Sequence, residues 1–185
     1  LARLPAPFRA EGGTVTAANS SSISDGAAAV TMMRRSEADK RGLTPIATII
    51  GHSTHASTPG LFPSAPVGAM NRLLERVGWD AKDVDLWEVN EAFAVVAMIA
   101  MRDLGIAHEK INVHGGACAL GHPIGASGAR IVVTLISALR KYGKLDRTQV
   151  MAPAIRLARE GFVLNRGDTD ILDTTVERIR KDPEA

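Results

Sequence analysis

The sequence GGACALGHPIGASGAR, residues 115–130, decides how the chain folds around one histidine. Pro123 follows His122 directly, and a residue before proline is pushed out of the helical region toward extended geometry. Glycines on both sides let the backbone bend steeply and let a ligand approach closely. The sequence therefore predicts that His122 projects from a tightly bent loop. Residues 126–139 then predict a helix whose N-terminal amide groups face the same loop.

A histidine beside a helix N-terminus tends to stay neutral, because the positive end of the helix dipole disfavours a second positive charge. A neutral imidazole can act as a general base or donate a hydrogen bond to an oxyanion. A Gly-rich turn between a strand and a helix can also contain a histidine that has no chemical role. Taken by itself, the tripeptide GHP favours that structural interpretation, so the functional one depends on other segments of the chain.

Two further segments change this balance. The sequence VNEAF at residues 89–93 lies upstream of the histidine loop, and GTVTAANSSSISDGAAAV at residues 13–30 lies further upstream. In their order and spacing, the three segments resemble the C-terminal half of a thiolase, an acetyl-CoA acetyltransferase, over residues 1–144. The resemblance implies that His122 activates a nucleophilic cysteine. It also implies that His122, with a water held by Asn90, forms an oxyanion hole for the thioester carbonyl.

The same resemblance implies a set of substrate contacts. Ser21 matches a serine that contacts the pantetheine arm of coenzyme A, and Ala92 and Phe93 would line the acyl pocket. Loop polarity explains Ser21 about as well, and a phenylalanine on an apolar helix face is more often part of the core. The implied ligand is an acyl-CoA thioester that serves as substrate, with no separate cofactor. No metal site is predicted, since His52 and His55 lie in a Ser/Thr/Pro-rich loop without a third ligand.

Composition limits the classes of protein to consider. A chain of 185 residues with 45% hydrophobic residues is sufficient for one ordinary domain with an appendage. The net charge of +2 and the 4% aromatic content argue against a nucleic-acid partner. No apolar run approaches the roughly 20 residues needed to span a bilayer, so no membrane partner is predicted. The single cysteine, Cys118, fits a reducing compartment, and the cytoplasm is the expected location. A first residue Leu1 is typical of a piece of a longer protein.

Hydrophobic periodicity predicts alternating strands and helices. Strands are expected at residues 26–33, 45–51, 84–89 and 111–114. Helices are expected at residues 36–41, 66–77, 91–104 and 126–142, each followed by glycine. This alternation predicts an α/β fold, a layered domain with largely parallel strands whose carboxyl ends carry the functional loops. Asn90 and His122 fall in such loops and are expected to lie together at one edge of the sheet.

The chain departs from the thiolase pattern after Gly143. Thiolases continue with a hairpin that carries a Cys-x-Gly-Gly-Gly segment, and its cysteine moves a proton during carbon–carbon bond formation. Residues 145–185 instead resemble a segment of the large subunit of gamma-glutamyltransferases. Helices are expected there at residues 154–159 and 168–180. A divergent thiolase tail is the alternative interpretation.

These features predict three parts and a function for the whole. The parts are the last segment of a thiolase N-terminal domain at residues 1–44, an incomplete thiolase C-terminal domain at 45–144 and a helical tail at 145–185. Thiolase chemistry uses two cysteines, and Cys118 occupies a position that is usually a small or apolar residue.

The chain is therefore expected to be a thiolase-type acyltransferase that is inactive by itself. In complete form, the resemblance implies a homo-oligomer that carries out thiolysis or Claisen condensation of 3-ketoacyl-CoA. Two alternatives stay open. One is a non-catalytic module for coenzyme A binding or assembly, and the other is a chimeric reading frame without a selected function.

Overall fold

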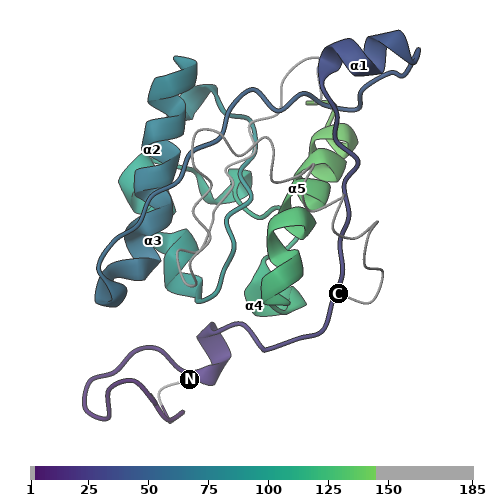
Figure 1. The fold of residues 1–185 in the computed structure, drawn as a ribbon. Helices are drawn as coiled ribbons and strands as arrows, with labels where there is room; N and C mark the ends of the chain where they lie inside the picture. Colours follow the sequence, from purple (N-terminus) through teal and green to yellow (C-terminus); the bar gives the residue numbers. More distant parts are fainter. Residues whose placement is uncertain (1–2, 145–185) are drawn as a thin grey trace.

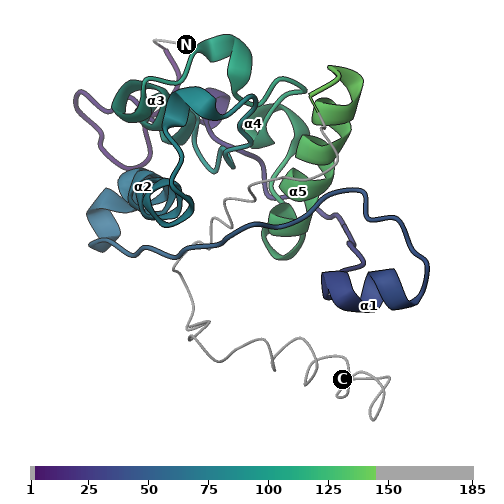
Figure 2. The same cartoon turned by 90° about the horizontal axis from the view of Figure 1, so that it is seen from above.

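A computed structural model describes residues 3–144 of the chain (Figures 1 and 2). The α-helices of this part are α1 (Arg35–Lys40), α2 (Ala65–Val77), α3 (Ala94–Leu104), α4 (Ala117–Leu120) and α5 (Ile124–Lys141). Short 3₁₀ helices lie between them, η1 (Ala17–Asn19), η2 (Pro59–Ser64), η3 (Ala81–Asp83) and η4 (His108–Lys110). The helices predicted at 154–159 and 168–180 fall outside the described residues.

One extended stretch, residues 84–91, runs between two helical layers, and we call it the central segment. Figure 1 shows α2 and α3 side by side on one side of it and α5 on the other, and α2 and α3 contact each other directly. Side chains of an extended chain alternate between its two faces. The central segment therefore offers one set of side chains to α2 and α3 and the other set to α5.

The packing follows this alternation. Trp87 and Val89 belong to the larger core, whereas Leu86 packs against Leu135 and Leu139 of α5. Helices α2 and α3 supply most of the larger core, and Val84, Ile106 and Ile111 complete it. The members from α2 and α3 are Val67, Met70, Leu73, Leu74, Val96, Ala97 and Ala100. Trp87 and Val89 thus hold the larger core together, joined by Val84 at the start of the segment. Leu86, Glu88 and Asn90 face α5 or the loop that leads into it.

The four predicted helices are confirmed, with boundaries that shift by one to three residues. Gly78 and Gly105 adopt the left-handed conformation that ends α2 and α3. Helix α3 begins at Ala94 rather than at residue 91, because Phe93 is extended and pairs with Ser20 in an antiparallel bridge. The short helix α4 was not predicted from the sequence.

The predicted strands are wrong for the part of the chain that the structure describes, where no regular strand forms. Segments 84–89 and 111–114 do run parallel, but they meet in a single bridge between Trp87 and Ile111. A strand needs a neighbour along several residues before its ladder of hydrogen bonds is stable. The layered arrangement is present here without a continuous sheet.

The apolar segment at residues 26–33 departs furthest from expectation. It was predicted as a buried strand, but it contains no helix or strand and is mostly exposed, with Met32 half exposed. A run of small apolar residues is buried in a sheet when neighbours lie on both of its faces. Among residues 3–144, this segment has no such neighbours. Residues 45–51 likewise form no regular strand.

Asn112 replaces much of the missing strand pairing. Its Oδ1 accepts the Val89 N–H at 2.8 Å, and its Nδ2 donates to the Val89 carbonyl at 2.8 Å. The backbone beside it pairs too, since the Asn112 N–H donates to the Trp87 carbonyl at 2.8 Å. Asn112 has φ +48°, a conformation that asparagine tolerates better than most residues. The side-chain amide thus holds the central segment as a neighbouring peptide group would.

We predict that Asn112→Asp destabilises the fold by about 3 kcal/mol, because the Val89 carbonyl loses its donor and a second carboxylate is placed against Glu91. Urea denaturation followed by tryptophan fluorescence measures the change. Asn71→Asp on the exposed face of α2 is the matched control and should leave the midpoint nearly unchanged. Equal midpoints for the two variants would refute the role given to Asn112.

Candidate functional site

His122 projects from the bent loop that the sequence predicts. Gly121 before it has φ +91°, and a methyl group at this position would overlap the Ser24 side chain. The His122 N–H donates to the Ser22 carbonyl at 3.0 Å, so the loop is tied to the extended N-terminal part of the chain. After Pro123, helix α5 begins at Ile124. The imidazole is buried, with His122 8% exposed.

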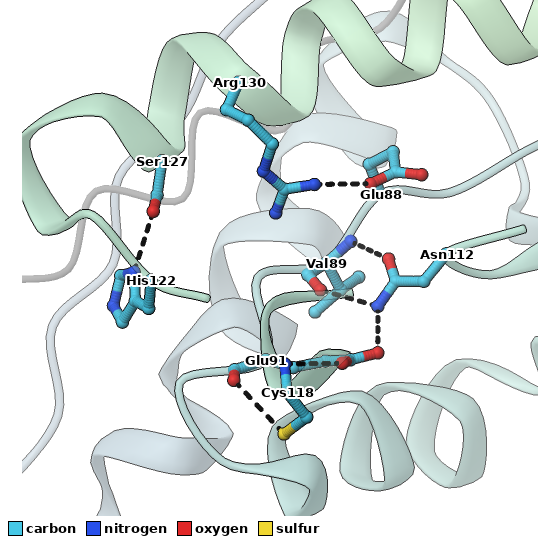
Figure 3. Close-up of polar contacts among 8 residues, drawn as sticks. All are labelled: Glu88, Val89, Glu91, Asn112, Cys118, His122, Ser127 and Arg130. Atoms are coloured by element: carbon cyan, nitrogen blue, oxygen red, sulfur yellow. Dashed lines mark hydrogen bonds and ion pairs between the residues drawn. The ribbon is translucent and has the colours of Figure 1, made fainter. Parts of the chain in front are cut away.

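A chain of hydrogen bonds fixes the proton on this imidazole. The Ser127 hydroxyl donates to the Pro123 carbonyl at 3.1 Å, so its oxygen accepts from His122 Nδ1–H at 2.7 Å (Figure 3). The unprotonated Nε2 then faces Asn90 Nδ2 at 3.3 Å, where the amide donates. In this arrangement each of the three side chains has a partner. Nε2 is the unprotonated ring nitrogen, and its lone pair accepts the Asn90 N–H and can act as a base when that hydrogen bond is released.

Burial lowers the pKa of His122 below its ordinary value of 6.5, and the positive charge of Arg130 lowers it further. The sequence predicted a neutral histidine from the helix dipole. The same neutral state results here from removal of water and from a nearby cation. At neutral pH the imidazole is therefore able to accept a proton.

Asn90 comes from the central segment and is likewise buried, at 7% exposed. The expected proximity of Asn90 and His122 is confirmed, although the two lie between the central segment and α5 rather than at the edge of a continuous sheet. Among residues 3–144, Asn90 Oδ1 has no hydrogen-bond partner. The amide nitrogen of Asn90 is thus bound to His122, while the amide oxygen can accept a hydrogen bond from another group.

Sequence reasoning missed a buried ion pair beside this contact. Glu88 is 2% exposed, and its Oε2 lies 3.6 Å from a terminal nitrogen of Arg130 on α5 (Figure 3). Burial raises the pKa of Glu88 to about 7, with Arg130 opposing the shift and Glu91 adding to it. Two spacings could have revealed the pair. Glu88 precedes Asn90 by two residues on one extended face, and Arg130 follows Ser127 by three on one helix face.

Two family models cover most of the chain. The model described as the C-terminal domain of thiolase matches residues 43–154, and the model of the thiolase N-terminal domain matches residues 1–36. The chain belongs to the thiolase family. The match to the C-terminal model extends ten residues beyond Lys144, where the thiolase resemblance was expected to end.

Complete thiolases are considerably longer than this chain. It is 45% identical over 144 residues to the cytosolic acetyl-CoA acetyltransferase of Mus musculus, covering 77% of this chain and 36% of that protein. It is 48% identical over 147 residues to acetyl-CoA acetyltransferase 1 of Arabidopsis thaliana, covering 77% of this chain and 35% of the relative. The chain therefore spans about a third of the length of these relatives.

Solved thiolases have the same fold over the shared part. The acetyl-CoA acetyltransferase of Bacillus anthracis superposes with a TM-score of 0.73 at 42% identity, covering 77% of this chain and 36% of that one. A human mitochondrial 3-ketoacyl-CoA thiolase in complex with CoA superposes with a TM-score of 0.67 at 39% identity and equal coverage. The thiolase-like fold expected from the sequence is confirmed.

The side chains expected to contact substrate lie together in this thiolase chain. The Ser21 hydroxyl donates to the Ala92 carbonyl at 2.9 Å, and the Ser21 N–H donates to the same oxygen at 3.1 Å. The Phe93 ring packs against Phe8 and Phe62, with ring centroids 5.7 and 5.8 Å away. Phe93 also packs against the larger core. Ser21 and Phe93 therefore have structural partners, whatever they contact in a ligand.

Cys118, the single cysteine of this thiolase chain, has the surroundings of a packing residue. Its Sγ lies 3.6 Å from the Glu91 carbonyl, and its N–H donates to the Glu91 carboxylate at 3.2 Å. Burial, and then the charge of Glu91, raise the pKa of the thiol. A raised pKa means little thiolate at neutral pH, which is the opposite of what a nucleophile needs.

Among residues 3–144, no group of three or more His, Cys, Asp or Glu side chains is placed to hold a metal ion. None of the helices described between those residues combines the length and the apolar character needed to cross a bilayer.

We predict that Glu88 makes the stability of the chain fall as the pH rises. In the unfolded chain its pKa is the ordinary 4.5, and in the folded chain it is about 7. Between these values the folded state holds the proton more tightly, so the free energy of unfolding decreases by roughly 3 kcal/mol from pH 4.5 to 7.

Denaturant titrations at several pH values check this prediction. Glu88→Gln should remove this downward slope, while Glu75→Gln on the exposed face of α2 should keep it. An unchanged slope in Glu88→Gln would show that the Glu88 carboxyl titrates normally.

Proposed function

We propose that this chain supplies the base and part of the oxyanion hole for acyl transfer between coenzyme A thioesters. The buried contact between His122 Nε2 and Asn90 Nδ2 at 3.3 Å is the observation that supports the proposal most. A base and a hydrogen-bond donor converge there, and both come from segments on which the thiolase resemblance rests. The chain covers about 36% of its relatives, so the activity belongs to a larger assembly in which this part acts.

In the proposed reaction His122 carries the proton. The Asn90 N–H releases Nε2, which then accepts the proton of a cysteine thiol. The resulting thiolate attacks the carbonyl carbon of the thioester. The carbonyl oxygen becomes an oxyanion, which Asn90 stabilises through a held water. When the carbon–sulfur bond breaks, the departing coenzyme A thiolate takes the proton back from His122. Ser127 keeps Nδ1–H in place throughout, so Nε2 stays directed at the reacting atoms.

The nucleophilic thiol in this scheme comes from outside the chain. Cys118 is engaged with Glu91, and its pKa is raised. Thiolase chemistry also needs a second cysteine for the α-proton, and this chain has one cysteine in total. The chain is therefore inactive alone and becomes active when joined to the parts of a complete thiolase.

The proposed substrates are acetyl-CoA and short 3-ketoacyl-CoA thioesters, with no separate cofactor. Ser21 would contact the pantetheine arm, and its oxygen can still accept a hydrogen bond while it donates to Ala92. Ala92 and Phe93 would line the acyl pocket. A related human thiolase has been solved in complex with CoA, which supports this class of ligand. The complete protein would be a cytoplasmic homo-oligomer.

The proposed organisation joins two pieces of thiolase domain to a tail. Residues 1–44 would be the last segment of the N-terminal domain and residues 45–144 the core of the C-terminal domain, an assignment supported by the two family matches. An appended tail, expected from the sequence at residues 145–185 on a resemblance to a gamma-glutamyltransferase segment, would begin within the thiolase match, which extends to residue 154. The tail lies outside the described residues.

One observation favours a second candidate function. A single thiol that is held as a packing residue suits a coenzyme A-binding or assembly module that does no chemistry. Such a module would bind coenzyme A equally well with or without His122, whereas the catalytic proposal requires that histidine for turnover.

We predict that the purified chain shows no thiolysis of acetoacetyl-CoA in the presence of coenzyme A. The reason is that Cys118 provides too little thiolate and no second thiol exists. Loss of the absorbance of the substrate enolate measures turnover. Turnover that disappears in Cys118→Ala would overturn the reading of Cys118 as a packing residue.

A chimera tests the proposed function directly. Residues 1–144 would replace the matching part of a complete acetyl-CoA acetyltransferase, whose remaining segments supply both cysteines. We expect turnover, a loss of roughly a thousandfold in kcat in His122→Ala, and a smaller loss of about a hundredfold in Asn90→Ala. His108→Ala, an exposed histidine, is the matched control and should retain full activity. Full activity in His122→Ala would exclude the proposal.

A further inference from the structure

Two polar links join the central segment to α5. One is the hydrogen-bonded series from Asn90 through His122 to Ser127, and the other is the ion pair of Glu88 with Arg130. The links are parallel because Glu88 and Asn90 share one face of an extended segment, while Ser127 and Arg130 lie three residues apart on one helix. Figure 3 shows Ser127 and Arg130 reaching down from α5 to His122 and Glu88.

Stability alone does not account for the ion pair. At 3.6 Å the closest atoms of Glu88 and Arg130 are beyond hydrogen-bond distance, and within residues 3–144 neither Glu88 oxygen nor any Arg130 guanidinium nitrogen has a hydrogen-bond partner. Taking two such charges out of water costs more than a loose pair regains. Apolar residues of similar size would stabilise the same interface at least as well. The presence of this buried ion pair must therefore be explained by its electrostatic effect on a neighbouring group.

The group that they act on is His122. Arg130 belongs to the same helix face as Ser127, which holds His122 Nδ1, and its positive charge disfavours a second positive charge on the imidazole. We propose that Arg130, anchored on Glu88, is a positioning residue that places a cation beside His122, and that Glu88 is the group through which pH changes this field. The inference rests on the proposed function, because it gives a role to the surroundings of the proposed base.

The charged groups around Glu88 determine how the electric field at His122 changes with pH. Arg130 faces Glu88 from α5, and Glu91 acts on it from the central segment. Because the pKa of Glu88 is about 7, Glu88 carries a charge above this pH and partly neutralises Arg130. Below it, Glu88 is protonated and Arg130 acts on His122 with its full charge. Acidification therefore strengthens the field that keeps His122 neutral.

NMR titration of the His122 imidazole in the purified chain tests this inference without any turnover. In the unsubstituted chain we expect two inflections, one near pH 7 from Glu88 and one below 6.5 from His122 itself. Arg130→Met should move the His122 pKa up toward 6.5, and Arg130→Lys should keep it low because the charge remains. Glu88→Gln should abolish the inflection near pH 7 and leave the lower one in place.

Matched variants separate charge from packing. Arg140→Met removes an exposed arginine from the same helix and should leave both inflections unchanged. If Arg130→Met does not fold, the double variant Glu88→Gln/Arg130→Met removes both charges and should show the same upward shift. An unshifted His122 pKa in the Arg130→Met or double variant would overturn the inference. So would an equal shift in Arg130→Lys, or an inflection near pH 7 that survives in Glu88→Gln.

The outcome is distinguishable from that of the proposed function. A chimera without turnover, combined with the expected titration shifts, would refute the thiolase chemistry and confirm the role of Arg130. An active chimera with an unshifted titration would refute the role of Arg130 and confirm the chemistry.

Discussion

The pairing of the Asn112 side chain with Val89 is the contact on which the site depends. An extended segment that lacks strands on both sides has few ways to satisfy its peptide groups or to hold its direction. The Asn112 amide meets both polar groups of Val89 at 2.8 Å and also donates to Glu91. Since Asn90 lies between those two residues, its side chain is fixed from both sides of the backbone. The amide can then face α5 without a sheet behind it.

His122 is held in a different way, by residues close to it in sequence. Ser127 lies five residues later, and its hydroxyl is itself fixed by the Pro123 carbonyl. The loop and the first turn of α5 therefore form one unit that sets both the ring orientation and the proton position. Bringing this unit against the central segment completes the site. The same packing of α5 buries Glu88 and Arg130, so charge enters the interface together with the base.

The difference between contacts that are local in sequence and contacts that join distant segments explains how much could be predicted from the sequence. The histidine loop and the helices follow from local signals, such as the proline after His122 and the glycines after each helix, and those predictions are confirmed. Strands were predicted from apolar runs such as residues 26–33, but a strand forms through its neighbours, which local sequence does not report. The Glu88–Arg130 pair joins segments some forty residues apart in sequence. Its partners could have been inferred from their spacing to Asn90 and Ser127 once those two were known to meet.

Because Asn112 holds the central segment and Ser127 holds His122, substitutions at these two residues should disturb the site in different ways. A substitution at Ser127 frees the imidazole ring but leaves the central segment in place, because Asn112 holds that segment independently. A substitution at Asn112 moves Asn90 away from a histidine that is still correctly oriented. Arg130 lies between these cases, since it contacts the central segment through Glu88 and acts on His122 through its charge. It is therefore the residue through which the position of the segment and the basicity of the histidine are coupled.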